Sequence, residues 1–183
     1  LAAASFAVID NFFGSVEIGN LRSEVLALDN SLFVQGRTGG GGGKTFETVV
    51  RGDRVARLQG NDSRVPSLGA LLRRADQLVK TLAVSLPTLR RITSRSQPML
   101  ACYPDGGAGY IRHLDNPGGN RRVLTLLVYL NPEPWDPTDG GQLKLFHDDG
   151  SATVVEPVLN RAVVFLSRKV WHEVLAANRE RWA

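Results

Sequence analysis

Residues 123–130 have the sequence VLTLLVYL, a short apolar run rich in residues that favour β-strands. Six further segments of the same kind surround it, at residues 99–103, 110–114, 142–146, 152–155, 162–166 and 172–176. Turn residues separate these segments, and the distance along the chain from one to the next is short. Seven strands with this spacing predict an antiparallel sandwich or barrel.

The first half of the chain carries a different pattern. Residues 6–10 (FAVID) predict a strand, whereas apolar residues recur at helical spacing from Ile18 to Leu28 and more strongly from Leu68 to Leu82. Helices that precede a run of strands argue against alternating βαβ units. We therefore expect a mainly β (α+β) fold, a jelly roll of the cupin-like kind with two N-terminal helices bracing one face. We expect one domain over residues 1–183, with helical support in 1–90 and the jelly-roll core in 96–183.

The segment between the two helices has less regular features. Residues 45–58 form two β-rich halves around Gly52 and Asp53, which predicts a hairpin hinged at these two residues. Residues 39–43 are all glycine, and we expect the loop 36–44 to be mobile. The following Lys44-Thr45 does not complete a phosphate-binding loop, because Thr38 stands where that motif requires glycine.

Composition limits the class of protein. The 183 residues are 43% hydrophobic and 22% charged, which suits a soluble globular domain. No run of eighteen apolar residues occurs, and the apolar start is too short for a signal peptide, so we expect no membrane association. The single cysteine excludes an internal disulfide and favours a reducing compartment. The net charge of +4 is compatible with an acidic partner without requiring one.

The most informative cluster of polar residues is His113-Leu114-Asp115. In an extended segment residues i and i+2 point the same way, so His113 and Asp115 can converge on one metal ion. His172, in a late strand, is a third candidate ligand that a jelly roll can fold back beside them. Two histidines and one carboxylate leave half of the coordination sphere open, an arrangement typical of non-haem Fe(II). His147 is interpreted as solvated, although an exchange of roles between histidines stays open.

An open iron site that bound a dicarboxylate would need a fixed cation for the distal carboxylate, and arginine suits this role. Arg179 and Arg181 both follow His172 closely. In the strand 123–130, Thr125 and Tyr129 share one face, which we expect to line a pocket. A buried tyrosine hydroxyl needs a hydrogen-bond partner, and either a carboxylate or a backbone carbonyl would serve.

Several motifs in combination carry a resemblance to a known family. They are, in order, residues 101–104 (ACYP), 110–117 (YIRHLDNP), 129–131 (YLN), 135–136 (WD), 140–141 (GG) and 172–174 (HEV). The chain closely resembles the Fe(II)- and 2-oxoglutarate-dependent prolyl 4-hydroxylases of the oxygen-sensing type, the hypoxia-inducible-factor prolyl hydroxylases. The resemblance runs from residues 6–12 through 51–53 to 181–182.

This resemblance implies a double-stranded β-helix and a set of site residues. The implied iron ligands are His113, Asp115 and His172. Arg181 would hold the distal carboxylate of 2-oxoglutarate, Arg179 being its exposed competitor. The implied co-substrate pocket is completed by Tyr103, Tyr129, Leu143 and Val174. The implied contacts to the peptide substrate are Arg51, Asp53, Tyr110 and Arg122.

The implied activity is hydroxylation of prolyl residues in a protein or peptide, with Fe(II), 2-oxoglutarate, O2 and ascorbate as reductant. The implied location is the cytoplasm, with the nucleus as a second possibility. Two departures from the family pattern matter. The family continues past the arginine into another strand, whereas this sequence ends at Ala183, so we expect a truncated final strand. The glycine run 39–43 has no counterpart in the pattern and falls where substrate loops vary.

Three other functions use the same residues. A 2-oxoglutarate oxygenase could act on a nucleic-acid base or a small molecule, although the sequence lacks the aromatic and basic platform that binds single-stranded nucleic acid. A cupin-like module could bind a metal without catalysis. A hydrolase could activate a zinc-bound water on the same ligands. Conversion of 2-oxoglutarate to succinate that requires Fe(II) and O2 distinguishes the oxygenase from the last two.

Overall fold

The computed structural model describes residues 5–37 and 51–183. Within these ranges lie two α-helices, α1 (Ser15–Leu26) and α3 (Leu68–Ser85), and three short 3-10 helices, η1 (Asn30–Leu32), η2 (Pro87–Arg91) and η3 (Pro137–Asp139). The strands are β1 (Phe6–Ile9), β2 (Val34–Gln35), β3 (Arg54–Arg57), β4 (Met99–Tyr103), β5 (Ala108–His113), β6 (Leu124–Val128), β7 (Leu143–Phe146), β8 (Ala152–Val155), β9 (Ala162–Leu166), β10 (His172–Ala177) and β11 (Arg181–Trp182).

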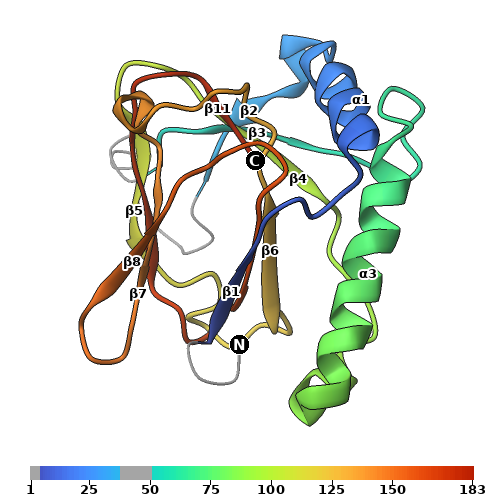
Figure 1. Cartoon of the computed structure of the whole chain (residues 1–183), viewed down its shortest axis with the longest axis vertical. Helices are drawn as coiled ribbons and strands as arrows, with labels where there is room; N and C mark the ends of the chain where they lie inside the picture. Colours follow the sequence, from blue (N-terminus) through green and yellow to red (C-terminus); the bar gives the residue numbers. More distant parts are fainter. Residues whose placement is uncertain (1–4, 38–50) are drawn as a thin grey trace.

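The strands form antiparallel sheets on two sides of one core. One side is the sheet β5-β10-β7-β8, and the other consists of β1-β9-β6 and β11-β4-β3-β2. Both helices lie on the outer side of the second layer, away from the sheet β5-β10-β7-β8 (Figure 1). The expectation of a mainly β jelly roll braced by N-terminal helices on one face is therefore confirmed.

Strand β4 shows how one short sequence serves two cores. Its side chains alternate between faces, as the period of two residues requires. Leu100 and Cys102 join a cluster that also contains buried residues of α1 and α3. Ala101 and Tyr103 join the cluster between the sheets. The alternation therefore places Tyr103, a residue implicated in the co-substrate pocket, in the interior of the jelly roll.

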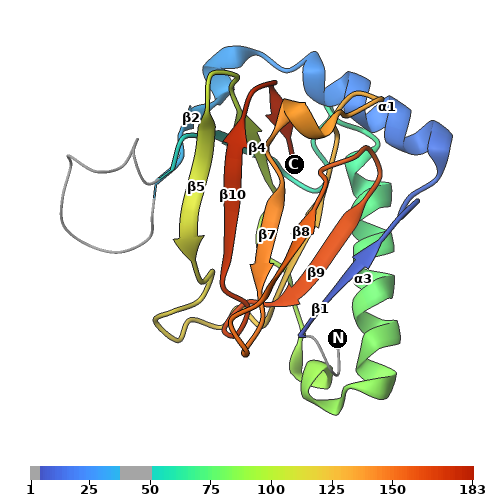
Figure 2. The same cartoon turned by 60° about the vertical axis from the view of Figure 1, so that its left-hand side comes forward.

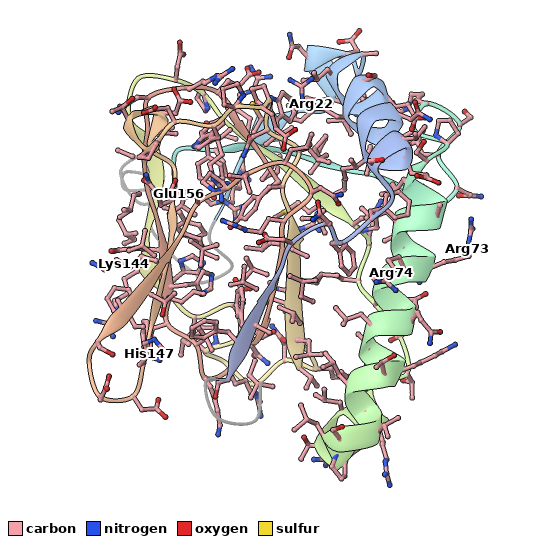
Figure 3. The ribbon with its side chains drawn as sticks, viewed as in Figure 1. Arg22, Arg73, Arg74, Lys144, His147 and Glu156 are labelled. Atoms are coloured by element: carbon pink, nitrogen blue, oxygen red, sulfur yellow. The ribbon has the colours of Figure 1, made fainter. Side chains whose placement is uncertain are left out.

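The two helices are attached to the strands and to each other through polar side chains. Arg22 of α1 donates to the Leu130 carbonyl at 3.1 Å, and Arg74 of α3 donates to the Phe12 carbonyl at 3.1 Å (Figure 3). Glu24 of α1 accepts hydrogen bonds from the backbone and hydroxyl of Ser67, the residue before α3. These bonds fix a rigid support behind the second layer. In the described part of the chain, no helix combines the length and the hydropathy needed to cross a bilayer.

The predicted hairpin hinged at Gly52 and Asp53 is wrong. Strand β3 pairs with β2 and β4, and Gly52 donates instead to the carbonyl of Gly109 at 2.8 Å. The first half of the predicted hairpin, residues 45–50, lies outside the described residues, as does the glycine run 39–43 of the loop expected to be mobile. The alternation of residues predicted strand β3 itself. Its pairing partners are set by segments that are distant in sequence, which the local sequence does not encode.

Candidate metal and co-substrate site

His113, Asp115 and His172 meet at one end of the sheet β5-β10-β7-β8. Each offers one ligand atom, and the three atoms lie within 4.8 Å of one another. The Asp115 Oδ1 atom is 3.5 Å from His113 Nε2 and 3.7 Å from His172 Nε2. Two neighbouring ligands of one octahedral ion lie about 3 Å apart, so small movements suffice for all three to bind a single metal. The predicted convergence is therefore present in the fold.

Both histidines present the same nitrogen to this point. His113 Nδ1 lies 2.8 Å from the Ile111 carbonyl, and His172 Nδ1 lies 3.0 Å from the Val170 carbonyl. Since a carbonyl only accepts, each Nδ1 carries the proton and each Nε2 keeps a free lone pair. Burial, followed by the proximity of His113, lowers the pKa of His172, which keeps its imidazole neutral and able to bind a metal.

The Asp115 carboxylate is held by one hydroxyl group from the opposite layer. Thr125 of β6 donates to Asp115 Oδ2 at 2.5 Å, and its oxygen lies 2.9 Å from that of Ser167. Burial would raise the pKa of Asp115, but its interactions with His113, His172 and Thr125 prevail and lower it to about 2. The carboxylate is thus ionised at neutral pH, with Oδ1 turned towards the histidines.

The histidine roles are not exchanged. His147 lies at the end of β7, where its Nε2 is 2.8 Å from the Thr153 hydroxyl and its ring contacts Phe6. It is half-buried rather than fully solvated. The metal-ligand cluster found among the described residues does not include it.

Arg181 begins β11, in the sheet β11-β4-β3-β2, and is buried in the core. Its side chain is 1% exposed, and its Nε donates to the Gly141 carbonyl at 2.7 Å. Its guanidinium lies 4.8 Å from the Tyr103 ring and 5.0 Å from the Tyr129 ring. Within residues 5–37 and 51–183 no carboxylate forms an ion pair with it. A buried cation without an anion is costly, which indicates a site for an anionic ligand.

A second buried group points to the same ligand. The Tyr129 hydroxyl is completely buried and has no hydrogen-bond partner among the described residues. Burial raises the pKa of Tyr129 and of Tyr103, so both phenols stay protonated and can donate. A carboxylate next to Arg181 would satisfy both the guanidinium and the Tyr129 hydroxyl. The donor set therefore fits a carboxylate ligand in the buried interior where Phe165, a neighbour of His172, also lies.

Comparison with known proteins identifies the family of this chain. Residues 98–183 match the family model of the 2OG-Fe(II) oxygenase superfamily. Prolyl hydroxylase EGLN3 of Mus musculus is 34% identical over 187 residues, which cover 100% of this chain and 77% of the relative. The chain belongs to the prolyl hydroxylases of the 2OG-Fe(II) oxygenase superfamily. Egl nine homolog 1 of Rattus norvegicus is also 34% identical, over 96% of this chain, and the chain spans about half (52%) of its length.

Solved structures of the superfamily share the fold. A prolyl hydroxylase from Trichoplax adhaerens, in complex with a peptide fragment of the hypoxia-inducible factor oxygen degradation domain, aligns with a TM-score of 0.84 and 32% identity. The alignment covers 100% of this chain and 82% of that one. A prolyl-4-hydroxylase from Pseudomonas putida aligns with a TM-score of 0.82 and 32% identity, covering 100% and 90% of the two chains.

The structure separates the two candidate arginines. Arg179 lies on the surface, where it pairs with Asp139 at 3.0 Å and stacks on Trp135, whereas Arg181 faces the core. The two residues are two positions apart, but Arg179 precedes β11 and Arg181 begins it. Of these two arginines, only Arg181 can bind an anionic ligand in the interior of the fold.

Leu143 and Val174 lie in the same buried cluster as Tyr103 and Tyr129. They come from neighbouring strands, β7 and β10, and are paired in register. Leu143 is fully buried and Val174 nearly so. Their side chains therefore form apolar walls of the interior next to Arg181, as expected for a pocket that excludes water, while their contact with a co-substrate stays a prediction.

The four residues implicated in peptide binding are called the rim, and three of them, Asp53, Arg51 and Tyr110, contact one another in series. Arg122 is exposed in the loop before β6. Arg51 and Asp53 form an ion pair through two hydrogen bonds, and Asp53 is completely buried. The Arg51 guanidinium lies 4.9 Å from the Tyr110 ring, and this ring stacks on the His113 imidazole at 3.6 Å. Asp53 thus acts on the rim through Arg51, and its contact with a peptide remains a prediction.

Sequence reasoning missed two residues that fix the site. Ser167 continues the alternation of Val163 and Phe165, a signal that a longer strand window would have shown. Buried Asn116 donates to the carbonyls of Asn120 and Arg122, which fixes the loop after Asp115. Three further residues were not predicted in a structural role.

One of these is Gly141, a residue of the quoted GG motif, which has a φ of +69°. A Cβ atom at this position would lie 2.7 Å from Arg181 Cδ. Only glycine therefore allows the buried arginine to pass so close to the backbone. The other two are Tyr110 and Phe165, whose rings pack on the imidazoles of His113 and His172 respectively.

Proposed function

We propose that this chain is an Fe(II)- and 2-oxoglutarate-dependent dioxygenase that hydroxylates prolyl residues in a protein or peptide. The observation that carries the proposal is the buried Arg181 guanidinium, without a carboxylate partner in the described structure, beside an open triad of His113, Asp115 and His172. The names of the similar proteins, which are prolyl hydroxylases, support the choice of substrate.

The residues of the triad would hold the metal. Iron(II), when bound, supplies the redox chemistry by which O2 and 2-oxoglutarate oxidise a C–H bond. His113 and His172 provide neutral nitrogens whose orientation is set by backbone carbonyls. Asp115 provides an ionised oxygen whose position is set by Thr125. This preorganisation lets the ion bind without rearranging the strands.

The pocket residues would orient the co-substrate. Arg181 binds its distal carboxylate through charge-assisted hydrogen bonds, and the Tyr129 hydroxyl donates a further one. Leu143 and Val174 exclude water from the same interior, which strengthens these interactions and protects reactive species from solvent. Tyr103 packs its ring against the guanidinium and fixes the orientation of the arginine.

The rim would receive the peptide. Tyr110 is half-buried, stacks on a metal ligand and offers an apolar surface beside the metal on which a prolyl ring can rest. Asp53 keeps Arg51 in place against the Tyr110 ring, and the exposed Arg122 adds a positive charge on the loop that Asn116 fixes. The peptide bound in the Trichoplax adhaerens relative supports a polypeptide substrate for this chain.

Two further parts of the proposal concern conditions. Ascorbate would serve as the reductant that restores Fe(II), as the resemblance implies. The cytoplasm, and the nucleus where one exists, would be the location. The state of the only cysteine is compatible with this, because Cys102 is buried and burial raises its pKa to about 12, which keeps the thiol unreactive.

The deciding experiment measures both products. The protein is incubated with Fe(II), ascorbate, 2-oxoglutarate, O2 and a library of proline-containing peptides, and succinate and peptide mass are followed. We expect succinate formation coupled to the gain of one oxygen atom on proline, and neither product without Fe(II) or O2. Succinate without any modified peptide would contradict the prolyl substrate, and its absence under all conditions would contradict the oxygenase.

A further inference from the structure

A cluster of aromatic and cationic side chains lies directly behind the metal triad, on the outer face of the sheet β5-β10-β7-β8. It consists of Arg112, Phe146 and Trp171, and we call it the outer clip. Arg112 precedes His113 and Trp171 precedes His172. Since neighbouring side chains of a strand point to opposite faces, the ligands face the core and the clip faces outward. Figure 2 views this sheet from outside, where no helix covers it.

The clip spans three strands. The Arg112 guanidinium of β5 lies 3.9 Å from the centre of the Phe146 ring of β7 and 5.4 Å from the Trp171 ring. Strand β10 lies between β5 and β7, so the arginine reaches across the beginning of the strand that carries His172. The Phe146 amide donates to the Trp171 carbonyl at 2.9 Å, which joins the two aromatic residues through the backbone.

The arginine is held by these rings rather than by a carboxylate. In the described ranges Arg112 forms no ion pair. A cation over an aromatic face is attracted by the ring's quadrupole, and a centroid distance of 3.9 Å is well within the range of this interaction. Arg112 and Trp171 are both exposed to solvent, which limits the strength of the contact.

Backbone pairing is regular on the β7 side of His172 but irregular on its β5 side, where His113 lies. His172 pairs with His113, but the register shifts before the next pair, Val174 with Tyr110, and again before Ala177. A β-bulge interrupts the ladder and leaves residues unpaired, so a regular set of hydrogen bonds does not hold the histidine pair in place. A side-chain contact between the ends of β5 and β10 can therefore hold the two strands together where the backbone ladder is irregular.

We propose that Arg112, Phe146 and Trp171 are positioning residues for the metal. The clip holds the ends of β5 and β10 together from outside and thereby sets the separation of the two imidazoles inside. None of the three residues touches the metal or the co-substrate. The inference rests on the metal role proposed above for His113, Asp115 and His172.

The test measures metal affinity directly. Mn(II) binding to the full chain is followed by isothermal titration calorimetry without 2-oxoglutarate, so the readout is independent of turnover. Arg112→Met keeps a side chain of similar length and removes the cation. We expect its dissociation constant to rise about fivefold, which corresponds to about 1 kcal/mol for an exposed cation–π contact. Trp171→Ala should weaken binding in the same direction, and Trp171→Phe should restore most of the affinity.

The matched control is Arg74→Met. Arg74 of α3 lies with its guanidinium 5.5 Å from the Phe12 ring. Figure 3 shows Arg74 on the opposite side of the molecule from Lys144 of β7. Its loss should lower the thermal midpoint and leave the Mn(II) affinity unchanged. Unaltered affinity in both Arg112→Met and Trp171→Ala, or equal weakening in Arg74→Met, would overturn the inference. If Arg112→Met does not fold, the comparison of Trp171→Ala with Trp171→Phe decides it.

The same titration separates this inference from the proposed function. Failure of the unmodified protein to bind Mn(II) would contradict the metal site itself. Tight binding by the unmodified protein, with no change in the clip variants, would contradict only the role of the clip.

Discussion

The interior pocket and the peptide rim of this protein are built differently. The pocket residues Arg181, Tyr129 and Leu143 are almost completely buried; Arg181 and Leu143 lie in strands, and Tyr129 directly follows β6. The rim residue Arg122 is exposed in a loop, and Arg51 lies just before β3, at the boundary of the described residues. Strand register therefore defines the pocket, whereas the rim depends on irregular segments and on ion pairs.

The difference teaches how chemistry and specificity can be separated within one fold. Side chains locked by packing hold a metal and a co-substrate in fixed geometry, as catalysis requires. Side chains on loops can vary without disturbing the core, as recognition of different peptides requires. If this division holds, pocket variants should lose the reaction, and rim variants should change only substrate use or local stability.

The largest effect is expected for a ligand of the triad. Asp115→Ala removes an ionised ligand atom, so metal affinity should fall by at least about a hundredfold and turnover should disappear. Calorimetry with Mn(II) and the circular dichroism spectrum check this. The control Asp149→Ala removes a surface carboxylate that caps a turn through Ser151 and should bind metal normally. Global unfolding of Asp115→Ala would assign the residue to stability instead.

The next effect separates the two arginines. Arg181→Met removes the buried cation and should raise the 2-oxoglutarate requirement roughly a hundredfold, the effect of losing about 2–3 kcal/mol of charge-assisted bonding. Arg179→Met breaks only a surface pair with Asp139 and should change it less than about twofold. The co-substrate dependence of succinate formation measures both. The reverse order would mean that the pocket is closed by the other arginine.

A smaller effect concerns the support of the rim. Asp53→Asn leaves the half-buried Arg51 guanidinium without its carboxylate and should lower the free energy of unfolding by about 3 kcal/mol. Urea denaturation measures this change. Asp62→Asn breaks a pair with the exposed Arg64 and should lower the free energy of unfolding much less. Equal losses in the two variants would remove the distinction between a buried and a surface pair.

The smallest effect tests recognition alone. Arg122→Gln removes an exposed cation at the rim and should raise the KM for peptide about fivefold, while the succinate formed without peptide is unchanged. Arg121→Gln alters the neighbouring exposed arginine and serves as the control. A change in the peptide-free reaction of Arg122→Gln would place this residue in the pocket and break the division between pocket and rim.

Much of the fold and the site was predictable from particular residues. The alternation in VLTLLVYL predicted the strand and placed Thr125 and Tyr129 on the same face, where the structure has them contacting Asp115 and Arg181. The spacing of His113 and Asp115 predicted their convergence. The pairing of β3 with β2 and β4, in place of the expected hairpin at Gly52 and Asp53, was not predictable, because the alternation in this strand suits several partners and distant strands make the choice.

The sequence by itself determined which chemical groups are available and on which side of each strand they lie. Only the tertiary structure decided that Arg181 is enclosed while Arg179 is solvated, that Asp53 is buried beneath Arg51, and that Arg112 reaches across β10 to Phe146. The physical reason is the range of the interactions involved. The direction of a side chain follows from its own backbone, but its burial and its partners depend on how distant strands pair and pack.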